Sequence, residues 1–220
     1  MPTEKEDSGE FAFNMETKQQ ILNKTEALFF RYGLKSVTMD DIARELGISK
    51  KTLYQFVENK QDLIEQIFQN RIEEEKTIMR EIREEAEDAI EEVLKIAIYV
   101  TTMLRAMTPT IMYDLEKYYK KTWLQMQQLH QKHIYQIIFD NLNWGIDNQL
   151  YRADFNPEII AKIYVAKSSD VADPERFPHA QYDMETLFRE FFLYHMHGVV
   201  APQGLELLHK HMETFQLIKN

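Results

Sequence analysis

Apolar residues recur every three or four positions along most of the 220-residue chain, and this spacing predicts α-helices. The first helix has one inward face and ends before Gly33, a residue type favoured at a left-handed helix C-terminus. That face is formed by Ile21, Thr25, Leu28, Phe29 and Tyr32. No stretch alternates at period two for long enough to predict a strand, so an all-α fold is expected.

Two short helices joined by a tight turn are predicted next. Thr38 is expected to cap the first of them, with Asp41 in the capping-box position, and Gly47 ends it. Ser49 is expected to cap the second, which runs to about Val57. Together these segments predict a helix-turn-helix over residues 38–57.

The rest of the chain is predicted to form a fourth helix, from Lys60 toward Ile82, and several more. Their approximate ranges are 86–107, 110–119, 120–144, 156–168, 182–198 and 202–218. The first fifteen residues are polar and carry no helical stripe, so a disordered tail is expected there. The predicted parts are this tail at 1–15, an N-terminal domain at 16–68 that contains the helix-turn-helix, and a C-terminal helical domain at 69–220.

The helix after Ser49 carries an unusual set of outward side chains. Its inward positions are Leu53, Phe56 and Val57, which leaves Lys50, Lys51, Thr52, Tyr54 and Gln55 outside. Lysine donates to O6 and N7 of guanine, glutamine pairs with N6 and N7 of adenine, and a helix N-terminus favours phosphate. The pattern therefore predicts a helix that lies in the major groove of duplex DNA. The alternative is a structural helical hairpin with an exposed basic edge.

The distribution of charge supports this prediction better than the net charge of −10 does. From Lys18 to Lys60 the chain has eight basic and five acidic residues, a net charge of +3. The acids concentrate later, in Glu73–Glu75 and again between Glu81 and Glu92. A weakly basic segment ahead of an acidic body can present one end to phosphate.

The segment from about Lys18 to Phe68 strongly resembles the DNA-binding domain of tetracycline-repressor (TetR) family regulators. The matching residues are Ile21-Leu22, Ala27-Leu28-Phe29, Tyr32-Gly33, Thr38-Met39-Asp40-Asp41-Ile42-Ala43, Leu46-Gly47-Ile48-Ser49, Thr52-Leu53-Tyr54 and Asn59-Lys60. The resemblance implies a TetR-like fold and a sequence-specific transcriptional regulator. By family habit it implies a ligand-responsive repressor that binds a palindromic operator as a homodimer.

The resemblance also assigns roles to single residues. It implies that Thr38 caps its helix against the phosphate backbone, that the outward residues of the following helix face the groove, and that Tyr54 and Lys60 clamp phosphates. The residues expected at the DNA are Thr38, Ser49, Lys50, Lys51, Thr52, Tyr54, Gln55 and Lys60. One departure is Phe56-Val57, where many family members carry tyrosine and phenylalanine. Phe56 lacks the hydroxyl for a phosphate hydrogen bond but preserves the packing.

The last two predicted helices are strongly apolar. Such stripes suit an ordinary core, and they also suit a four-helix bundle formed with a second copy. The resemblance favours the second interpretation, because relatives dimerise this way. The residues expected at the dimer interface are Phe188, Phe191, Phe192, Leu205, Leu208, Met212 and Phe215.

The middle helices combine aromatic, methionine and histidine residues. Such side chains form adaptable apolar walls with a few polar tips, although each of them also suits simple core packing. The resemblance implies an effector cavity in this region, and the residue types suit an apolar or aromatic compound. The residues expected to line it are Tyr99, Met103, Met107, Trp123, Met126 and His130.

Several classes of function are disfavoured. The chain has no cysteine, which excludes disulfides and thiol chemistry. Nucleophile-elbow, phosphate-loop and His-Glu zinc motifs are missing, so neither an enzyme nor a cofactor is expected. Histidines spaced by two on a helix point to different faces, so no metal site is expected. With neither an apolar span nor a signal-like start, a cytoplasmic protein is expected. The remaining rival is a helical ligand-binding protein with a vestigial DNA-binding segment.

Overall fold

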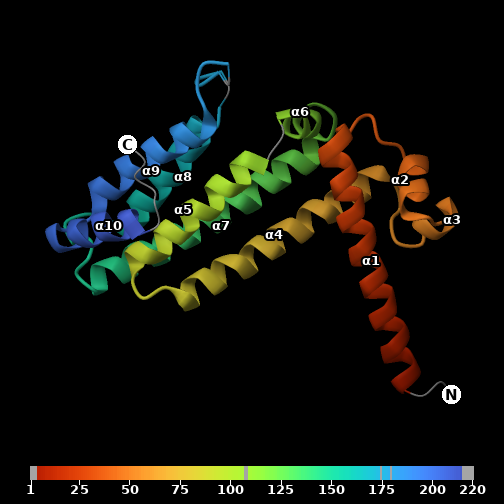
Figure 1. Cartoon of the computed structure of the whole chain (residues 1–220), viewed down its shortest axis with the longest axis horizontal. Helices are drawn as coiled ribbons and strands as arrows, with labels where there is room; N and C mark the ends of the chain where they lie inside the picture. Colours follow the sequence, from red (N-terminus) through yellow and green to blue (C-terminus); the bar gives the residue numbers. More distant parts are fainter. Residues whose placement is uncertain (1–3, 107–108, 174, 179, 215–220) are drawn as a thin grey trace. The chain divides into compact units, whose positions relative to one another are not determined.

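The computed structural model describes residues 4–106, 109–173, 175–178 and 180–214. Within these ranges the chain is helical and has no β-strand, which confirms the predicted all-α fold (Figure 1). The helices are α1 (Glu4–Tyr32), α2 (Met39–Leu46), α3 (Lys50–Leu53), α4 (Lys60–Glu85), α5 (Ala89–Ala106), α6 (Pro109–Tyr118), α7 (Lys120–Asp147), α8 (Pro157–Val171), α9 (Met184–Val199) and α10 (Pro202–Thr214).

The chain divides into two compact units. The N-terminal unit comprises residues 1–74 and 107–127, and the C-terminal unit comprises residues 75–106 and 128–220. This division differs from the predicted boundary between residues 68 and 69, because the segment 107–127 groups with the part of the chain that contains the helix-turn-helix. The reason is packing: Ile111 and Leu115 are buried in the core of the N-terminal unit.

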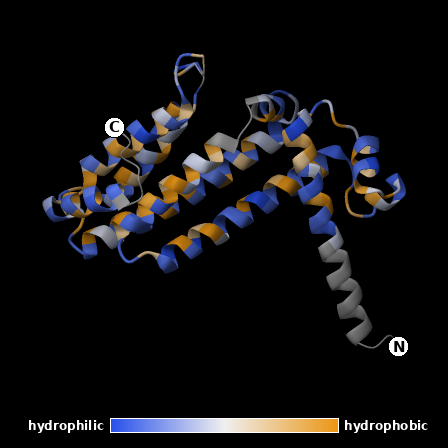
Figure 2. Ribbon diagram, in the orientation of Figure 1, coloured by the Kyte–Doolittle hydropathy of each residue, from blue (hydrophilic) through white to orange (hydrophobic). Residues whose placement is uncertain are grey.

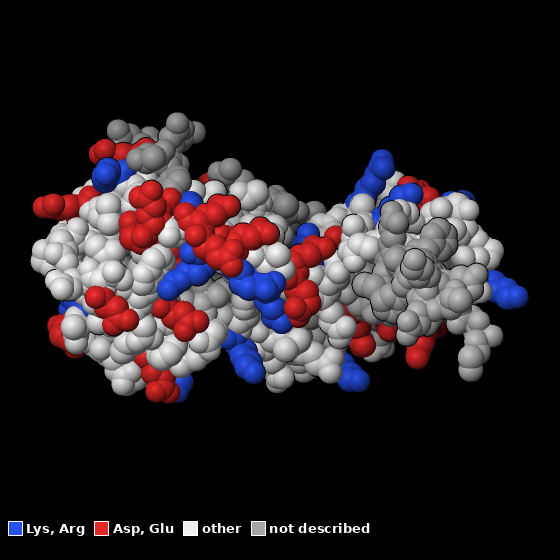
Figure 3. Space-filling model, turned by 90° about the horizontal axis from the view of Figure 1, so that it is seen from below, with Lys and Arg blue, Asp and Glu red and all other residues white. Residues whose placement is uncertain are grey.

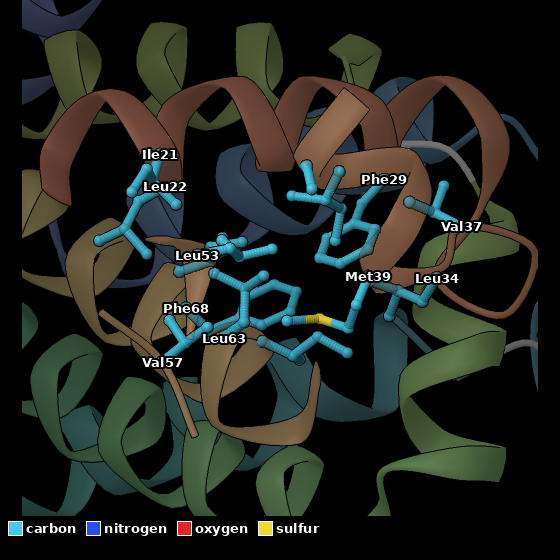
Figure 4. Close-up of a cluster of buried hydrophobic side chains, with 14 of the residues drawn as sticks. Ile21, Leu22, Phe29, Leu34, Val37, Met39, Leu53, Val57, Leu63 and Phe68 are labelled. Carbon is cyan, nitrogen blue, oxygen red and sulfur yellow. The ribbon is translucent and has the colours of Figure 1, made fainter. Parts of the chain in front are cut away.

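The core of the N-terminal unit gathers side chains from α1, α2, α3, α4 and the loops between them (Figure 4). Ile42, Leu53 and Leu63 are fully buried, and each anchors a different helix. Burying a side chain of this size stabilises the fold by about 1.5–3 kcal/mol. These anchors therefore fix α2 and α3 relative to α1 and α4.

Helix α1 begins at Glu4, which corrects the prediction of a disordered tail over residues 1–15. Residues 1–3 lie outside the described part of the chain. Proline is absent between Thr3 and Tyr32, so the sequence does not interrupt the helix there. Once the anchored half of α1 exists, each further turn is added without a second nucleation step. A missing apolar stripe therefore did not mean a missing helix.

The C-terminal unit has its own core, to which α5, α7, α8, α9 and α10 contribute. The predicted helix limits hold here to within a few residues. Asn156 caps α8 by accepting hydrogen bonds from the backbone N–H groups of Glu158 and Ile159, and Pro157 occupies the first turn as expected. A buried polar network adds specificity: the Asn141 side chain donates to the Glu92 carboxylate over 2.7 Å.

Hydrophilic and hydrophobic residues are mixed along the described helices (Figure 2). In the part of the chain that the structure describes, no helix is both long and apolar enough to cross a membrane. Acidic side chains gather mainly on the C-terminal unit in the view of Figure 3. This agrees with the acid-rich stretches that follow residue 72 in the sequence.

Candidate nucleic-acid interface

Helix α2 begins with the predicted capping box. The Thr38 hydroxyl oxygen accepts from the Asp41 backbone N–H over 3.2 Å, and the Asp41 carboxylate accepts from the Thr38 backbone N–H over 2.9 Å. The Thr38 hydroxyl donates to the same carboxylate over 2.6 Å, and these bonds hold the pKa of Asp41 below its usual value. Thr38 is exposed at the start of the helix. The cap therefore orders the surface end of α2.

The turn between α2 and α3 depends on Gly47. Its φ of 68° and ψ of 26° lie in the left-handed region, which glycine enters without steric cost. The Ile48 backbone N–H then reaches back to the Ala43 carbonyl over 3.1 Å. Ser49 follows and caps α3, because its hydroxyl accepts from the Thr52 backbone N–H over 3.0 Å. Both caps predicted from the sequence are confirmed.

Helix α3 is shorter than predicted. It ends at Leu53 instead of continuing to Val57, and the Gln55 and Phe56 backbone N–H groups bond three residues back, to Thr52 and Leu53. Such bonds tighten the chain into a turn. Burial of both Leu53 and Val57 draws this turn toward the core. Gln55 is therefore displayed from a turn and not from the helix itself.

The outward residues of this segment lie at the surface. Lys50, Lys51, Tyr54 and Gln55 are exposed, and Thr52 is half-buried with its hydroxyl 2.8 Å from that of Ser49. Phe56 packs against the core of the N-terminal unit. This agrees with the expectation that phenylalanine, which keeps the aromatic ring of tyrosine but has no hydroxyl, preserves the packing. Six of the eight predicted DNA-binding residues thus lie in the segment 49–55, and a seventh, Thr38, is exposed at the start of α2.

The eighth residue, Lys60, is placed differently from the others. Its ammonium group donates to the backbone carbonyl of Leu34 and lies 5.8 Å from the centre of the Phe29 ring. Burial lowers the pKa of Lys60. In the free protein this side chain therefore holds the loop between α1 and α2 against the start of α4.

Two acidic residues at this site were not singled out from the sequence. Asp40 accepts from the Lys50 ammonium over 3.0 Å. Asp114 of α6 is buried, and its carboxylate accepts from the Lys35 backbone N–H over 3.0 Å. Both contacts join separate helices or loops, so helical periodicity carries no signal for them.

The residues expected at a dimer interface are only partly available to a partner. Phe192, Leu208 and Met212 are buried in the core of the C-terminal unit, which corrects their assignment to an interface. Phe188, Phe191 and Leu205 are half-buried against the same core, and Phe215 lies outside the described residues. An apolar helix face that packs inside its own unit is not available to pack against a second copy. Other apolar residues are exposed on the same two helices of this unit or beside them: Ile159 and Ile163 on α8, and Tyr194 on α9.

The residues expected in an effector cavity are divided between the units. Tyr99, Met103 and His130 belong to the C-terminal unit, whereas Trp123 and Met126 belong to the N-terminal unit and pack against its core. Met107 lies outside the described residues. His130 is near the Glu75 carboxylate, at 3.7 Å. Core packing thus accounts for Trp123 and Met126.

Comparison with known proteins agrees with this geometry. Residues 21–67 match the family described as bacterial regulatory proteins, tetR family. The uncharacterized HTH-type transcriptional regulator YvaF of Bacillus subtilis (strain 168) is 30% identical over 158 residues, which are 71% of this chain and 82% of that protein.

Solved structures share the fold at lower sequence identity. A TetR-family transcriptional regulator from Agrobacterium tumefaciens matches with a TM-score of 0.64 at 15% identity, over 85% of this chain and 99% of that one. The transcriptional regulator FadR from Bacillus subtilis, in complex with stearoyl-CoA, matches with a TM-score of 0.60 at 14% identity, over 81% of this chain and 97% of that one. Taken with the capped α2, the left-handed turn and the exposed face of α3, these matches show that the chain belongs to the tetR family of DNA-binding transcriptional regulators.

Proposed function

We propose that the protein is a ligand-responsive repressor that binds a palindromic operator as a homodimer. The observation that carries this proposal is the capped α2–turn–α3 segment, whose outward side chains are exposed while Leu53 is fully buried. A short helix with one apolar side buried in the core and one polar side exposed to solvent is suited to the major groove. The buried side fixes its position, and the outer side is free to read bases.

The exposed residues divide by the chemistry they offer to DNA. Lys51 and Gln55 have long side chains that reach base edges, where lysine prefers guanine and glutamine prefers adenine. Thr38, Ser49 and Tyr54 carry hydroxyl groups suited to phosphate oxygens, which position the protein without reading sequence. Each half of the proposed operator is read by one such segment.

The proposed dimer uses the outer face of α8 and α9. Ile159 and Ile163 are 54% and 50% exposed, one turn apart on α8, and Tyr194 on α9 is 83% exposed. A two-fold dimer buries the same patch on both copies. To contact successive major grooves on one side of DNA, its two α2–turn–α3 segments would have to be about 34–36 Å apart. The two-fold symmetry of the proposed dimer is the reason for proposing a palindromic operator.

The proposed effector is an apolar or aromatic compound that contacts α5. Tyr99 and Met103 are half-buried, one turn apart on this helix, and offer an aromatic wall beside an adaptable one. FadR from Bacillus subtilis, which shares the fold, has been solved with stearoyl-CoA. In the present chain the effector is proposed to lower DNA affinity through a coupling of about 1–3 kcal/mol.

A route for this coupling is the segment 107–127. The Thr122 hydroxyl of α7 donates to the Glu65 carboxylate of α4 over 3.1 Å, and Asp114 holds the backbone of Lys35. Helix α7 then continues into the C-terminal unit. A shift of this helix would therefore be passed to the core beneath α2 and α3.

Selection of duplexes from a random pool tests the proposal. Purified protein should enrich a two-fold symmetric sequence, and candidate apolar compounds should lower its affinity for that sequence. Failure to bind any duplex at low ionic strength would leave a ligand-binding protein with a vestigial DNA-binding segment. An effector that binds free and DNA-bound protein equally would remove the coupling but leave DNA reading intact.

A further inference from the structure

The exposed surface formed by α2, the turn at Gly47 and α3 contains an ion pair that joins the two helices. Asp40 lies in the first turn of α2, and Lys50 is the first residue of α3. The Lys50 Nζ is 3.0 Å from each carboxylate oxygen of Asp40. The Asp40 side chain is 71% exposed and that of Lys50 is 46% exposed. A carboxylate therefore lies on the same surface as the outward residues of α3.

The packing below holds the two charges side by side. Ile42 and Ala43, which follow Asp40 in α2, are buried, and so is Leu53, one turn after Lys50. The left-handed Gly47 sets the direction of α3 between them. The backbone thus places Asp40 and Lys50 within reach of each other. The hydrogen bond to Asp40 and the charge of this carboxylate raise the pKa of Lys50.

Folding stability is a weak reason for a carboxylate at this position. Ion pairs this exposed contribute little to stability, because water screens them and both side chains lose freedom. The capping of α2 is performed by the neighbouring Asp41. The cost of Asp40 falls on DNA binding instead, since an acidic group repels phosphate.

At the DNA surface the pair has two opposite effects. It holds an ammonium group that would otherwise neutralise a phosphate, and this reduces binding that is independent of sequence. At a base edge the same pair is complementary to a G·C pair, because guanine O6 and N7 accept from lysine while cytosine N4 donates to a carboxylate. A carboxylate here therefore lowers affinity for DNA in general more than affinity for one sequence.

We propose that Asp40 is a specificity-determining residue that keeps Lys50 from the phosphate backbone and directs the pair to a G·C base pair. The inference rests on the proposed sequence-specific function. It assigns a role to an acidic residue on a surface where only basic and uncharged polar residues are expected to contact DNA.

The test is Asp40→Asn, which keeps the shape of the side chain and removes its charge. On a random-sequence duplex we expect the slope of log K against log salt to steepen by about 0.9, the value for one more phosphate contact. If the variant and the wild type bind equally at 1 M salt, this difference in slope corresponds to about eightfold tighter binding of the variant at 0.1 M salt. On the duplex enriched by the wild-type protein the gain should be smaller, so the ratio of specific to random affinity falls. Repeating the selection should show a relaxed preference at one G·C position in each half-site.

Glu45→Gln is the matched control. Glu45 is exposed on the same helix and its substitution changes the net charge equally, but it lies about 140° around the helix from Asp40. We expect its salt slope to match that of the wild type. The double variant Asp40→Asn/Lys50→Ala should lose the gain on random DNA, since the freed ammonium is what produces it.

Two results would overturn the inference: equal effects of Asp40→Asn and Glu45→Gln on the salt slope, or weaker binding of Asp40→Asn to random DNA. Either is distinguishable from failure of DNA reading itself, which the wild-type protein alone would reveal. Unfolding curves of all variants should superimpose on that of the wild type, which separates DNA affinity from folding.

Discussion

We expect His195 to make the stability of the C-terminal unit sensitive to acid. Its ring lies edge-on to that of Tyr164, with 4.7 Å between the centroids, and so links α9 to α8. Tyr164 is itself buried and contacts the Phe191 ring at 4.8 Å. Burial lowers the pKa of His195 from 6.5 to about 4. The packed helices therefore accept the neutral imidazole and resist the charged one.

The size of the effect follows from the difference in pKa between the two states. Above pH 6.5 the histidine is neutral in both the folded and the unfolded chain, so the full stability is present. As the pH falls below 6.5, the unfolded chain binds a proton that the folded chain refuses until about pH 4. The free energy of unfolding should therefore decrease by about 2 kcal/mol between pH 7.5 and pH 5, and by about 3 kcal/mol at pH 3.

Urea unfolding at pH 7.5 and at pH 5, at one fixed protein concentration, measures this decrease. Other titrating groups also contribute, so the quantity of interest is the difference between the wild type and His195→Leu. The variant should lose about 2 kcal/mol less than the wild type over this range. His197→Gln is the control, because His197 is exposed on the same helix, and it should behave as the wild type does. A His195→Leu variant that loses as much stability as the wild type would refute the reasoning.

Three further outcomes are expected from the structure. Lys60→Met removes the hydrogen bond to the Leu34 carbonyl, so urea unfolding should show a loss of about 1 kcal/mol; a flattened salt slope of DNA binding with unchanged stability would instead restore the phosphate role. Gly47→Ala places a side chain in the left-handed region, and the free energy of unfolding should fall by about 1–2 kcal/mol. Ile163→Glu puts a charge on the exposed face of α8, and light scattering should then report a monomer, whereas a dimer is proposed for the wild type. A dimer that survives this substitution would place the interface elsewhere.

Local signals in the sequence predicted the helices well. The capping box of Thr38 and Asp41 and the serine cap of α3 depend on residues three positions apart, so the sequence contains all of their determinants. The same holds for Asn156 and Pro157 at the start of α8. Where the start of a helix depends on its own residues, the sequence is sufficient to predict it.

Contacts between distant segments could not be predicted in this way. Lys60 was expected at phosphate, but its ammonium meets a carbonyl 26 positions earlier in the chain. Phe192 and Leu208 showed a stripe that suits a core as well as an interface, and only the packed unit distinguishes these. Helix α1 extended beyond its stripe, because elongation needs no burial of its own.

The grouping of residues 107–127 with the N-terminal unit limits how this regulator can be rebuilt. A chimaera that transplants only residues 1–68 onto another body would leave behind Leu115, whose side chain is fully buried among those residues in the intact protein. The transplanted part would have a cavity in its core where Leu115 belongs, and the apolar side chains around that cavity would be exposed. Exchange of DNA-binding domains between relatives should therefore succeed only when residues 107–127 are transferred together with residues 1–68.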